Sequence, residues 1–250
     1  MPERFNEMGY WEIVTRQMSI VSKSEQTRFK ESKIAVIGCG GIGGSVIEML
    51  ARMGVGSLVI IDKDSFDMSN LNRQVMSSID SLRKSKSEVT KENVRLINPY
   101  IEVTEYNEEL NESNIDKMLS GCDVVIDALD NLYTRVLISR YTKENKIPFV
   151  HGAIHGTMGQ LSVFSEKTPS YEEIFSLPSK GKELNKNTKF DLEKLNHGVP
   201  PVIGPTPNII GSLESFEAFK LITGIGTPTF APKVLNIDLL DLSSFSCLEL

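Results

Sequence analysis

Short apolar segments, rich in β-branched residues, alternate along the chain with segments whose apolar residues recur at helical spacing. Strands are predicted at residues 34–37, 58–61, 101–106, 124–126, 147–154, 159–164 and 233–240. Helices are predicted at residues 46–53, 81–97, 113–119, 132–145 and 208–223. Strands that alternate with helices are typical of parallel sheets. We therefore expect an α/β, Rossmann-like fold with a mostly parallel, doubly wound sheet and helices on both faces.

Two segments lie outside this alternation. Residues 1–31 are polar, and their apolar residues from Trp11 to Val21 are spaced loosely, as on an amphipathic helix. We expect this N-terminal helical arm to pack on the rest of the chain or on a second subunit. Residues 165–207 lack apolar periodicity, which predicts a crossover loop without regular structure that holds part of a substrate. Since no repeat or linker is evident, we expect residues 1–250 to form one domain.

A glycine-rich turn joins the first predicted strand to the first predicted helix. Its sequence, GCGGIGG, contributes Gly38, Gly40, Gly41 and Gly43. Glycines here let the backbone approach a phosphate, and the unpaired N–H groups of the helix N-terminus face the anion. Asp62, at the end of the next strand, is suited to accept hydrogen bonds from ribose hydroxyls. A tight structural turn is the alternative, but the flanking strands and Asp62 favour a nucleotide site.

The residues after Asp62 indicate which nucleotide is bound. They include acidic, amide and cationic side chains at Asp64, Asn70, Arg73, Gln74, Lys84 and Lys86. Cations near the carboxyl ends of parallel strands neutralise the charge that develops when a phosphorus is attacked. The cluster therefore predicts phosphoryl or nucleotidyl transfer from a triphosphate rather than hydride transfer. The alternative interpretation is a solvated loop with ordinary surface charge.

Another group of polar residues follows the predicted strand at residues 124–126. It contains Asp127, Asp130 and Asn131, at the strand end where open parallel sheets bind their ligands. Carboxylate oxygens suit Mg²⁺, so we expect Asp130 to hold Mg²⁺ against the phosphates and Asn131 to belong to the same site. The alternative role for Asp130 is the N-cap of the following helix, and the two roles are compatible.

Composition excludes several classes of protein. The net charge of −6 argues against a nucleic-acid partner bound through general basicity. The apolar runs are shorter than a membrane span and the N-terminus lacks a signal pattern, which predicts a cytoplasmic protein without membrane contact. Cys39, Cys122 and Cys247 are too few and too scattered for a disulfide framework or a four-thiolate zinc site, so free thiols are expected.

Several motifs together resemble the ThiF/MoeB/ubiquitin-activating-enzyme family. They are the glycine turn, the tracts IIDKD, SNLNRQ and DVVIDALDN, Lys86 before a helix that ends INP, and the late helix IIGSLESFEAFKLITG. The resemblance covers about residues 10–240. It implies ATP-dependent adenylation of a carboxylate with release of pyrophosphate, commonly at the C-terminal glycine of a ubiquitin-like sulfur carrier.

The resemblance also implies a role for each matching residue. Asp62 would bind the ribose, Arg73 and Lys86 the phosphates with support from Asn70, and Asp130 would hold Mg²⁺. Arg16 would reach into the neighbouring subunit's site, because members with this arm resemble homodimers. A carboxylate is already ionised at pH 7, so no general base is needed and catalysis would rest on charge neutralisation and alignment.

Two family features are missing from the sequence. Members with structural zinc carry a Cys-x-x-Cys pair where residues 169–173 read PSYEE, so we expect no zinc. Members that form a thioester or persulfide carry a cysteine where residues 196–200 read NHGVP. The reaction is therefore expected to stop at the acyl-adenylate, and a thiol or amine on another molecule, such as an acceptor protein with a thiol, would take the acyl group.

The identity of the carboxylate stays open at this point. Without an acceptor cysteine, the chain also resembles methanogen proteins that adenylate the guanylylpyridinol precursor of the iron-hydrogenase cofactor, and we favour such a small carboxylate slightly over a sulfur carrier. Two other classes are an NAD-dependent oxidoreductase, which leaves SNLNRQ and Lys86 without roles, and a non-catalytic docking subunit. Docking subunits of this family typically lose the arginine and aspartate that this chain keeps.

Overall fold

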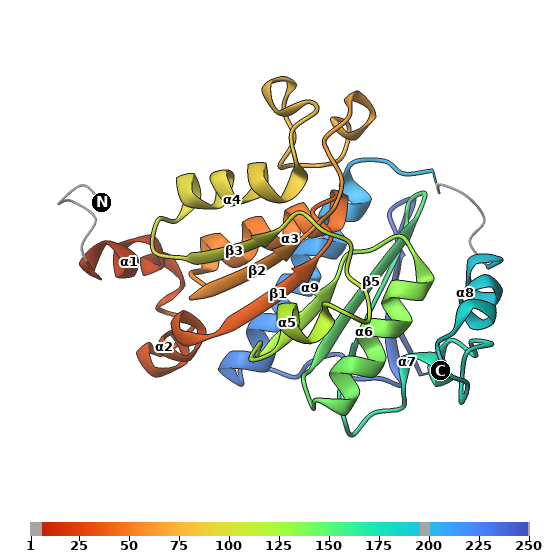
Figure 1. The fold of residues 1–250 in the computed structure, drawn as a ribbon. Helices are drawn as coiled ribbons and strands as arrows, with labels where there is room; N and C mark the ends of the chain where they lie inside the picture. Colours follow the sequence, from red (N-terminus) through yellow and green to blue (C-terminus); the bar gives the residue numbers. More distant parts are fainter. Residues whose placement is uncertain (1–6, 196–200, 250) are drawn as a thin grey trace.

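An eight-stranded sheet forms the centre of the computed structural model, which describes residues 7–195 and 201–249 (Figure 1). The strands are β1 (Lys33–Ile37), β2 (Ser57–Ile61), β3 (Glu102–Tyr106), β4 (Val124–Asp127), β5 (Phe149–His155), β6 (Met158–Phe164), β7 (Lys233–Asp238) and β8 (Asp241–Glu249). Their order is β3-β2-β1-β4-β5-β6-β7-β8. The first five strands in this order run parallel to one another, and each of the last three is antiparallel to the strand before it. The predicted mostly parallel α/β fold is confirmed.

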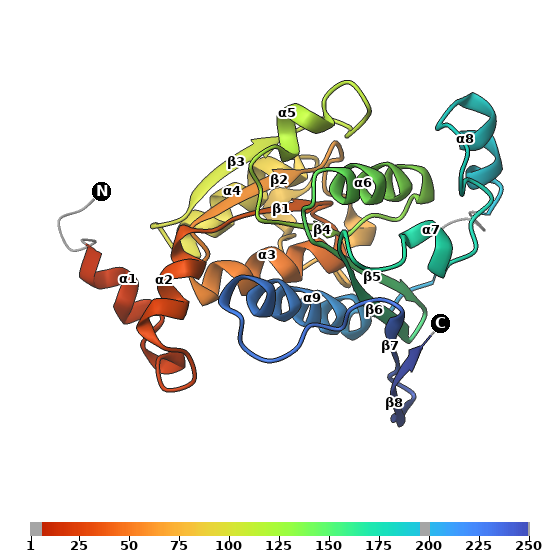
Figure 2. The ribbon, with the colours of Figure 1, turned by 90° about the horizontal axis from the view of Figure 1, so that it is seen from below.

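Helices cover both faces of this sheet (Figure 2). One face carries α2 (Lys23–Glu31), α3 (Gly41–Met53), α4 (Lys86–Ile97) and α9 (Pro205–Thr223), and the other carries α5 (Ile115–Leu119), α6 (Leu132–Glu144), α7 (Tyr171–Ile174) and α8 (Lys186–Glu193). Within β1, Val36 packs toward the first group and Ala35 toward the second. Because both faces are buried, each central strand is apolar at nearly every position, which explains the continuous apolar runs in the sequence.

The predicted elements are present, although several differ from the prediction in where they begin or end. The helix predicted at residues 81–97 begins at Lys86, because the Ser85 side chain accepts a hydrogen bond from the backbone N–H of Glu88 and ends the preceding loop. The strand β8 was not predicted. It lies at the edge of the sheet, and those of its side chains that the structure describes, such as Leu242, are exposed, so they show no alternation of buried and exposed positions. Among the described helices, none combines the length and apolar character needed to cross a bilayer.

The described part of the N-terminal arm is helical, as predicted, but it is not one continuous amphipathic helix. Within the described residues, α1 (Glu7–Ile13) is separated from α2 by the 3₁₀ turn Thr15–Gln17, which interrupts the helical period. Buried and exposed apolar residues occur on both sides of the turn: Val14 and Val21 are buried, whereas Ile13 and Ile20 are exposed. The arm packs on its own chain, where the Tyr10 hydroxyl donates to the carbonyl oxygen of Gly54 at the end of α3 (2.6 Å).

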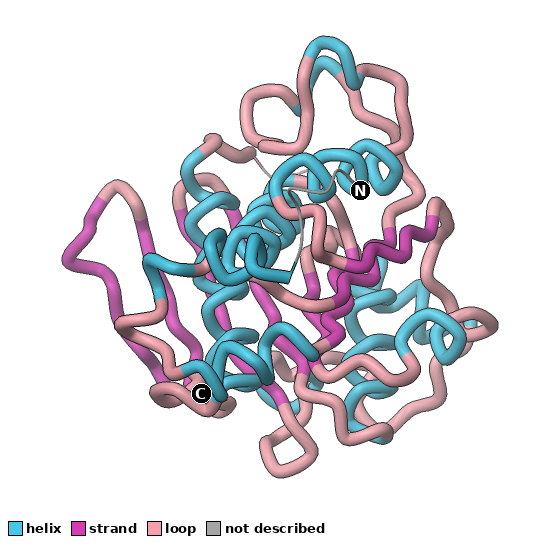
Figure 3. Tube along the Cα trace, turned by 90° about the vertical axis from the view of Figure 1, so that its left-hand side faces the viewer, coloured by secondary structure: helices cyan, strands magenta, loops and turns pink. Residues whose placement is uncertain are grey.

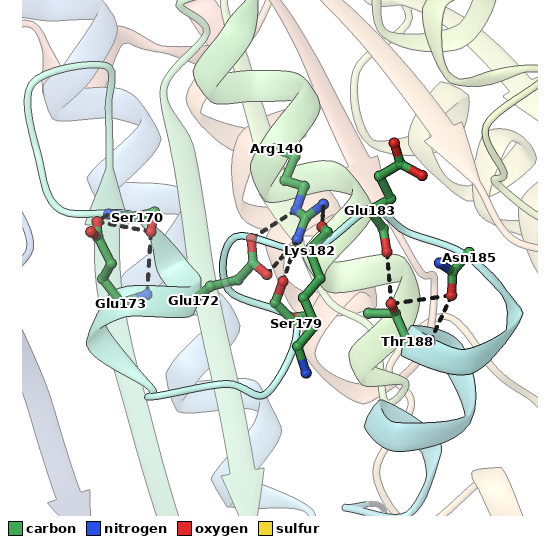
Figure 4. Close-up of polar contacts among 9 residues, drawn as sticks. All are labelled: Arg140, Ser170, Glu172, Glu173, Ser179, Lys182, Glu183, Asn185 and Thr188. Carbon is green, nitrogen blue, oxygen red and sulfur yellow. Dashed lines mark hydrogen bonds and ion pairs between the residues drawn. The ribbon is translucent and has the colours of Figure 1, made fainter.

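The crossover segment at residues 165–207 is more ordered than the sequence suggested. It contains α7 and α8, and Arg140 of α6 holds the chain between them (Figure 4). The guanidinium donates to both carboxylate oxygens of Glu172 (2.7 and 2.8 Å) and to the carbonyl oxygens of Ser179 and Lys182 (both 2.8 Å). These contacts are polar and join residues that are distant in sequence. They therefore produce no periodic pattern of apolar residues from which the order of this segment could be predicted. Residues 196–200, where the missing cysteine was noted, lie outside the described residues.

The described cysteine side chains agree with the expected chemistry. Cys39 and Cys122 are free thiols and both are buried. The side chain of Cys247 lies outside the described part of the chain.

One acidic side chain is buried between α9 and the sheet. Glu214 is fully buried against Gly152 of β5, and neither of its carboxylate oxygens has a hydrogen-bond partner within the described residues. Burial raises the pKa of Glu214 well above its ordinary value, and the negative charge of Asp127 adds to the effect against the opposing charge of Arg135. Burial therefore favours the neutral, protonated form of Glu214.

Replacing this acid should change how stability depends on pH. Above pH about 4.3, the usual pKa of Glu, the unfolded state releases the Glu214 proton while the folded state keeps it, so wild-type stability falls as pH rises. Glu214→Gln cannot ionise in either state. We expect it to raise the free energy of unfolding by about 1 kcal/mol or more at pH 8 and by little at pH 5, measured by urea denaturation. An equal change at both pH values would contradict a neutral buried acid.

Candidate active site

A cavity of about 430 Å³ lies along the carboxyl ends of β2, β1, β4 and β5. Eleven of the residues predicted for the nucleotide site line it: Gly38, Gly40, Gly41, Asp62, Asp64, Asn70, Arg73, Gln74, Lys86, Asp130 and Asn131. Residues from four separate stretches of sequence thus meet in one place. A concave site with a few convergent polar groups is the usual form of a small-molecule site.

The glycine turn brings the start of α3 to the cavity wall. Gly38 has φ +99°, and a Cβ at this position would lie 2.6 Å from the carbonyl oxygen of Ala128, so a side chain is excluded there. Gly43 does not line the cavity; a Cβ on it would lie 1.8 Å from the carbonyl oxygen of Gly38. Gly43 therefore allows α3 to pack closely on the turn, and the helix N-terminus opens at Gly40 and Gly41 with its N–H groups available to an anion.

Asp62 is fixed by the backbone of two neighbouring segments. The N–H groups of Cys39 and Asp64 donate to its two carboxylate oxygens, at 2.7 and 2.8 Å respectively. Burial raises the pKa of Asp62, while the two N–H donors and the charge of Lys86 oppose the increase. Each oxygen retains a further lone pair, so the carboxylate can still accept hydrogen bonds from a ligand.

Two cations are held at the same cavity by weak or neutral partners. Lys86, the first residue of α4, has a side chain only 10% exposed, and its Nζ lies 3.4 Å from an oxygen of Asp64. The guanidinium of Arg73 donates to the carbonyl oxygen of Ser69 (2.8 Å) and to the Asn72 side chain (2.9 Å). Among the residues that the structure describes, no short ion pair cancels either charge, so both are available to an anionic ligand.

The two amide residues differ in how their side chains are satisfied. The Asn70 carbonyl oxygen accepts a hydrogen bond from the backbone N–H of Asp67 (3.0 Å), which orders the loop after β2. The carbonyl oxygen of Gln74 is buried and has no hydrogen-bond partner within the described residues. An unpaired buried acceptor is costly. Because Gln74 lines the cavity, its side chain fits a ligand that donates a hydrogen bond there.

The structure also separates the two roles considered for Asp130. The side chain of Asn131 accepts from the N–H of Thr134 (2.9 Å) and is the N-cap of α6, so the alternative of an Asp130 cap is wrong. Among the described residues, no group of three or more His, Cys, Asp and Glu side chains is placed to hold a metal ion. One carboxylate suits Mg²⁺ when phosphate oxygens and water supply the other ligands, and Asp130 in this cavity fits that mode.

Other cavity residues were missed by the sequence interpretation. Ala153, Ile154 and Val202 form an apolar end, and Val202 reaches it through a parallel bridge with Gly156. These small apolar residues carry no chemical signature. Arg135 also lines the cavity. Its spacing of four residues after Asn131 on a predicted helix was the available signal, since residues i and i+4 share a helix face.

Arg16 does not reach the cavity of its own chain. It is exposed on the 3₁₀ turn of the arm, and this arm packs at Gly54, beyond the C-terminal end of α3. The cavity is at the other end of this 13-residue helix, about 20 Å away at 1.5 Å per residue. The assignment of Arg16 to a neighbouring subunit's site stays a prediction.

Comparison with known proteins identifies the family. The chain matches the ThiF family over residues 14–250. It is 33% identical over 227 residues to the SAMP-activating enzyme E1 of Haloferax volcanii, covering 90% of this chain and 80% of that protein. It is 31% identical over 236 residues to the sulfur carrier protein adenylyltransferase of Thermus thermophilus (91% and 83%). It is also 30% identical over 238 residues to the molybdopterin-synthase adenylyltransferase of Haemophilus influenzae (93% of each).

Solved structures share the fold at lower identity. E. coli MccB crystallised with ATP aligns with a TM-score of 0.75 and 23% identity, over 90% of this chain and 65% of the longer MccB chain. The complex of MccB with AMPCPP and MccA gives a TM-score of 0.79, over 100% of this chain and 74% of MccB. At this identity the likeness concerns the fold alone. By its sequence relatives, the chain belongs to the ThiF family and is an adenylyltransferase of the ThiF/MoeB type.

Proposed function

We propose that this chain uses ATP and Mg²⁺ to adenylate a carboxylate, with release of pyrophosphate. The observation that carries the proposal is the convergence of Asp62, Arg73, Lys86 and Asp130 on one cavity beside the N-terminus of α3. An acid for the ribose, two cations and a helix N-terminus for the phosphates, and a single carboxylate for Mg²⁺ together match a bound nucleoside triphosphate. An NAD-dependent dehydrogenase would leave Lys86 and the SNLNRQ tract without roles.

The residues would divide the binding of the nucleotide among them. Asp62, already held by two N–H groups, would accept the ribose hydroxyls. The N-terminus of α3 would face the phosphates, with Arg73 and Lys86 pairing with their charge. Asp130 would hold Mg²⁺, which would neutralise phosphate charge and make pyrophosphate a better leaving group.

The chemical step needs alignment and charge neutralisation rather than proton transfer. A carboxylate oxygen of the substrate would bond to the α-phosphorus as the bond between that phosphorus and the bridging oxygen of pyrophosphate breaks. The attacking acid is ionised at pH 7, so no residue has to remove a proton. Arg73 and Lys86 would stabilise the charge that builds up on the phosphate oxygens in the transition state. Arg16 of a second subunit would supply a third cation if the chain forms a homodimer.

Two classes of carboxylate are candidates. The missing cysteine at residues 196–200 supports a small molecule such as guanylylpyridinol, activated for an acceptor with a thiol on another protein. The sulfur carrier named for the Thermus thermophilus relative supports the C-terminal glycine of a carrier protein instead. The cavity's apolar end at Ala153, Ile154 and Val202 suits a chain or ring that brings the carboxylate to the phosphates.

ATP–pyrophosphate exchange tests the proposal and separates these substrates. Wild-type protein would be assayed with glycine-tailed carrier proteins and with pyridinol carboxylic acids. If ATP–pyrophosphate exchange requires one of these two classes of carboxylate and not the other, that class is the substrate. Binding of NAD without binding of ATP in calorimetry would contradict the proposal.

Removing either active-site cation should slow adenylation. Arg73→Ala and Lys86→Ala are each expected to lower the exchange rate about a hundredfold, or about 3 kcal/mol of barrier, because each removes a charge that stabilises the transition state. Lys84→Ala is the matched control, since Lys84 comes from the same loop but is exposed away from the cavity lining. Wild-type exchange rates in both cavity variants would rule out this assignment.

The trans role of Arg16 predicts complementation between two inactive variants. In a mixed dimer of Arg16→Ala and Arg73→Ala, one of the two sites has Arg73 from its own subunit and Arg16 from the partner. Co-expression should therefore restore exchange to about a quarter of the wild-type rate, since random pairing makes half the dimers mixed and each of these has one intact site. Folded single variants that remain inactive after co-expression would show that Arg16 does not act across subunits.

A further inference from the structure

A buried ion pair lies behind the turn that carries Asp130. Asp127, at the end of β4, is fully buried, and Arg135 of α6 has a side chain only 11% exposed. The Nε of Arg135 lies 2.5 Å from Oδ2 of Asp127. Removing two charges from water is costly, and such a pair is tolerated when its remaining hydrogen-bonding groups are satisfied.

Both members of this pair bond to the same residue. Oδ1 of Asp127 accepts from the backbone N–H of Leu129 (3.0 Å), and Nη2 of Arg135 donates to the carbonyl oxygen of Leu129. Leu129 directly precedes Asp130, and Asn131, which follows, is fixed as the N-cap of α6. Asp130 is thus held between two residues whose backbone or side chain is anchored.

The protonation of the surrounding groups keeps Arg135 paired. Although burial opposes ionisation, the Arg135 charge holds the pKa of Asp127 below its ordinary value. On the other side of Asp127, burial and the Arg135 charge lower the pKa of His151, which is therefore neutral and donates from Nδ1 to Oδ2 of Asp127 (2.8 Å). The guanidinium charge is cancelled within the protein, in contrast to the charges of Arg73 and Lys86.

We infer that Arg135 and Asp127 are positioning residues, which fix the turn at Leu129 and so hold the Asp130 carboxylate in place for Mg²⁺. This inference rests on the proposed function. Arg135 lines the cavity, but its Nε and Nη2 are already used by Asp127 and Leu129. When a residue that orients a metal ligand without touching the metal is mutated, the affinity of the site for the metal typically falls by about tenfold to a hundredfold.

The same helix offers a matched control. Arg140 lies five residues after Arg135 on α6 and also forms an ion pair, with Glu172 (2.7 Å). As Figure 4 shows, it holds Ser179 and Lys182 of the crossover segment. Arg140 is not among the residues that line the cavity. A change at Arg140 disturbs a comparable pair without altering the turn that carries Asp130.

The test is ATP binding by calorimetry with Mg²⁺ and with EDTA. Arg135→Lys keeps the charge but is too short to bridge Asp127 and Leu129, so it should weaken ATP binding in Mg²⁺ about tenfold or more and leave binding in EDTA unchanged. Arg140→Lys should match wild type in both conditions. Asp130→Asn should lose the effect of Mg²⁺ altogether.

A double variant guards against misfolding of the single one. Asp127→Asn with Arg135→Met removes both charges together, so no lone charge is left buried, and it should show the same selective loss in Mg²⁺.

Three results would count against these assignments. Full Mg²⁺ enhancement in folded Arg135→Lys and in the double variant would overturn the inference. An equal loss in Mg²⁺ and EDTA would overturn it too, because Arg135 would then contact the nucleotide itself. A wild-type protein that binds no ATP would instead overturn the proposed function, and this inference with it.

Discussion

The parallel register of β1 with its two neighbours sets the position of every strand-end residue in the site. Ile37, the last residue of β1, pairs with Ile61 of β2 and with Asp127 of β4. The three strands therefore end level with one another, and the residues that follow them, including Gly38 and Asp62, lie side by side. A slip of one residue in either pairing would exchange the side chains that face the two helical layers, such as Val36 and Ala35 of β1. The packing of these two layers therefore favours the observed register, and the register places the residues of the site.

This arrangement explains how a chain with a net charge of −6 presents a site for a polyanion. Among the buried groups, Asp127 and Arg135 form an ion pair, and burial favours the neutral form of Glu214. The groups suited to phosphate charge are Arg73 and Lys86 at the cavity wall and the N-terminus of α3. These two cations lie within a few ångströms of a ligand in the cavity, where salt screens their charge little. The negative charges elsewhere on the surface are more distant, and salt screens their effect on the ligand beyond about 8 to 10 Å.

The sequence was most informative where one residue type serves one purpose. Strands buried on both faces appear as apolar runs, and polar residues just after them, such as Asp62 and Asp130, fall at the ligand-binding edge of the sheet. Arg135 and Val202 could not be assigned in the same way, because their place depends on tertiary contacts from a helix and from a distant loop. The break in the arm at Thr15–Gln17 was missed for a related reason, since Tyr10 and Val14 pack on the end of α3 rather than on a helix face of constant period.

The helix α6 connects the turn that carries Asp130 to the crossover segment. Its first turn carries Asn131 and Arg135, which fix the turn of Asp130, and its later part carries Arg140, which holds the crossover segment through Glu172. The aromatic ring of Tyr171, next to Glu172, packs edge-on against His151 with ring centres 4.9 Å apart, and His151 in turn bonds to Asp127. The crossover segment is therefore joined to the strand ends beneath the cavity by both apolar and polar contacts. Polar pairs need defined distances and angles, whereas apolar packing tolerates small shifts. The polar pairs on α6 therefore set the orientation of the crossover segment and of the Asp130 turn relative to α6. The packing of Tyr171 on His151 buries apolar surface between the crossover segment and the sheet.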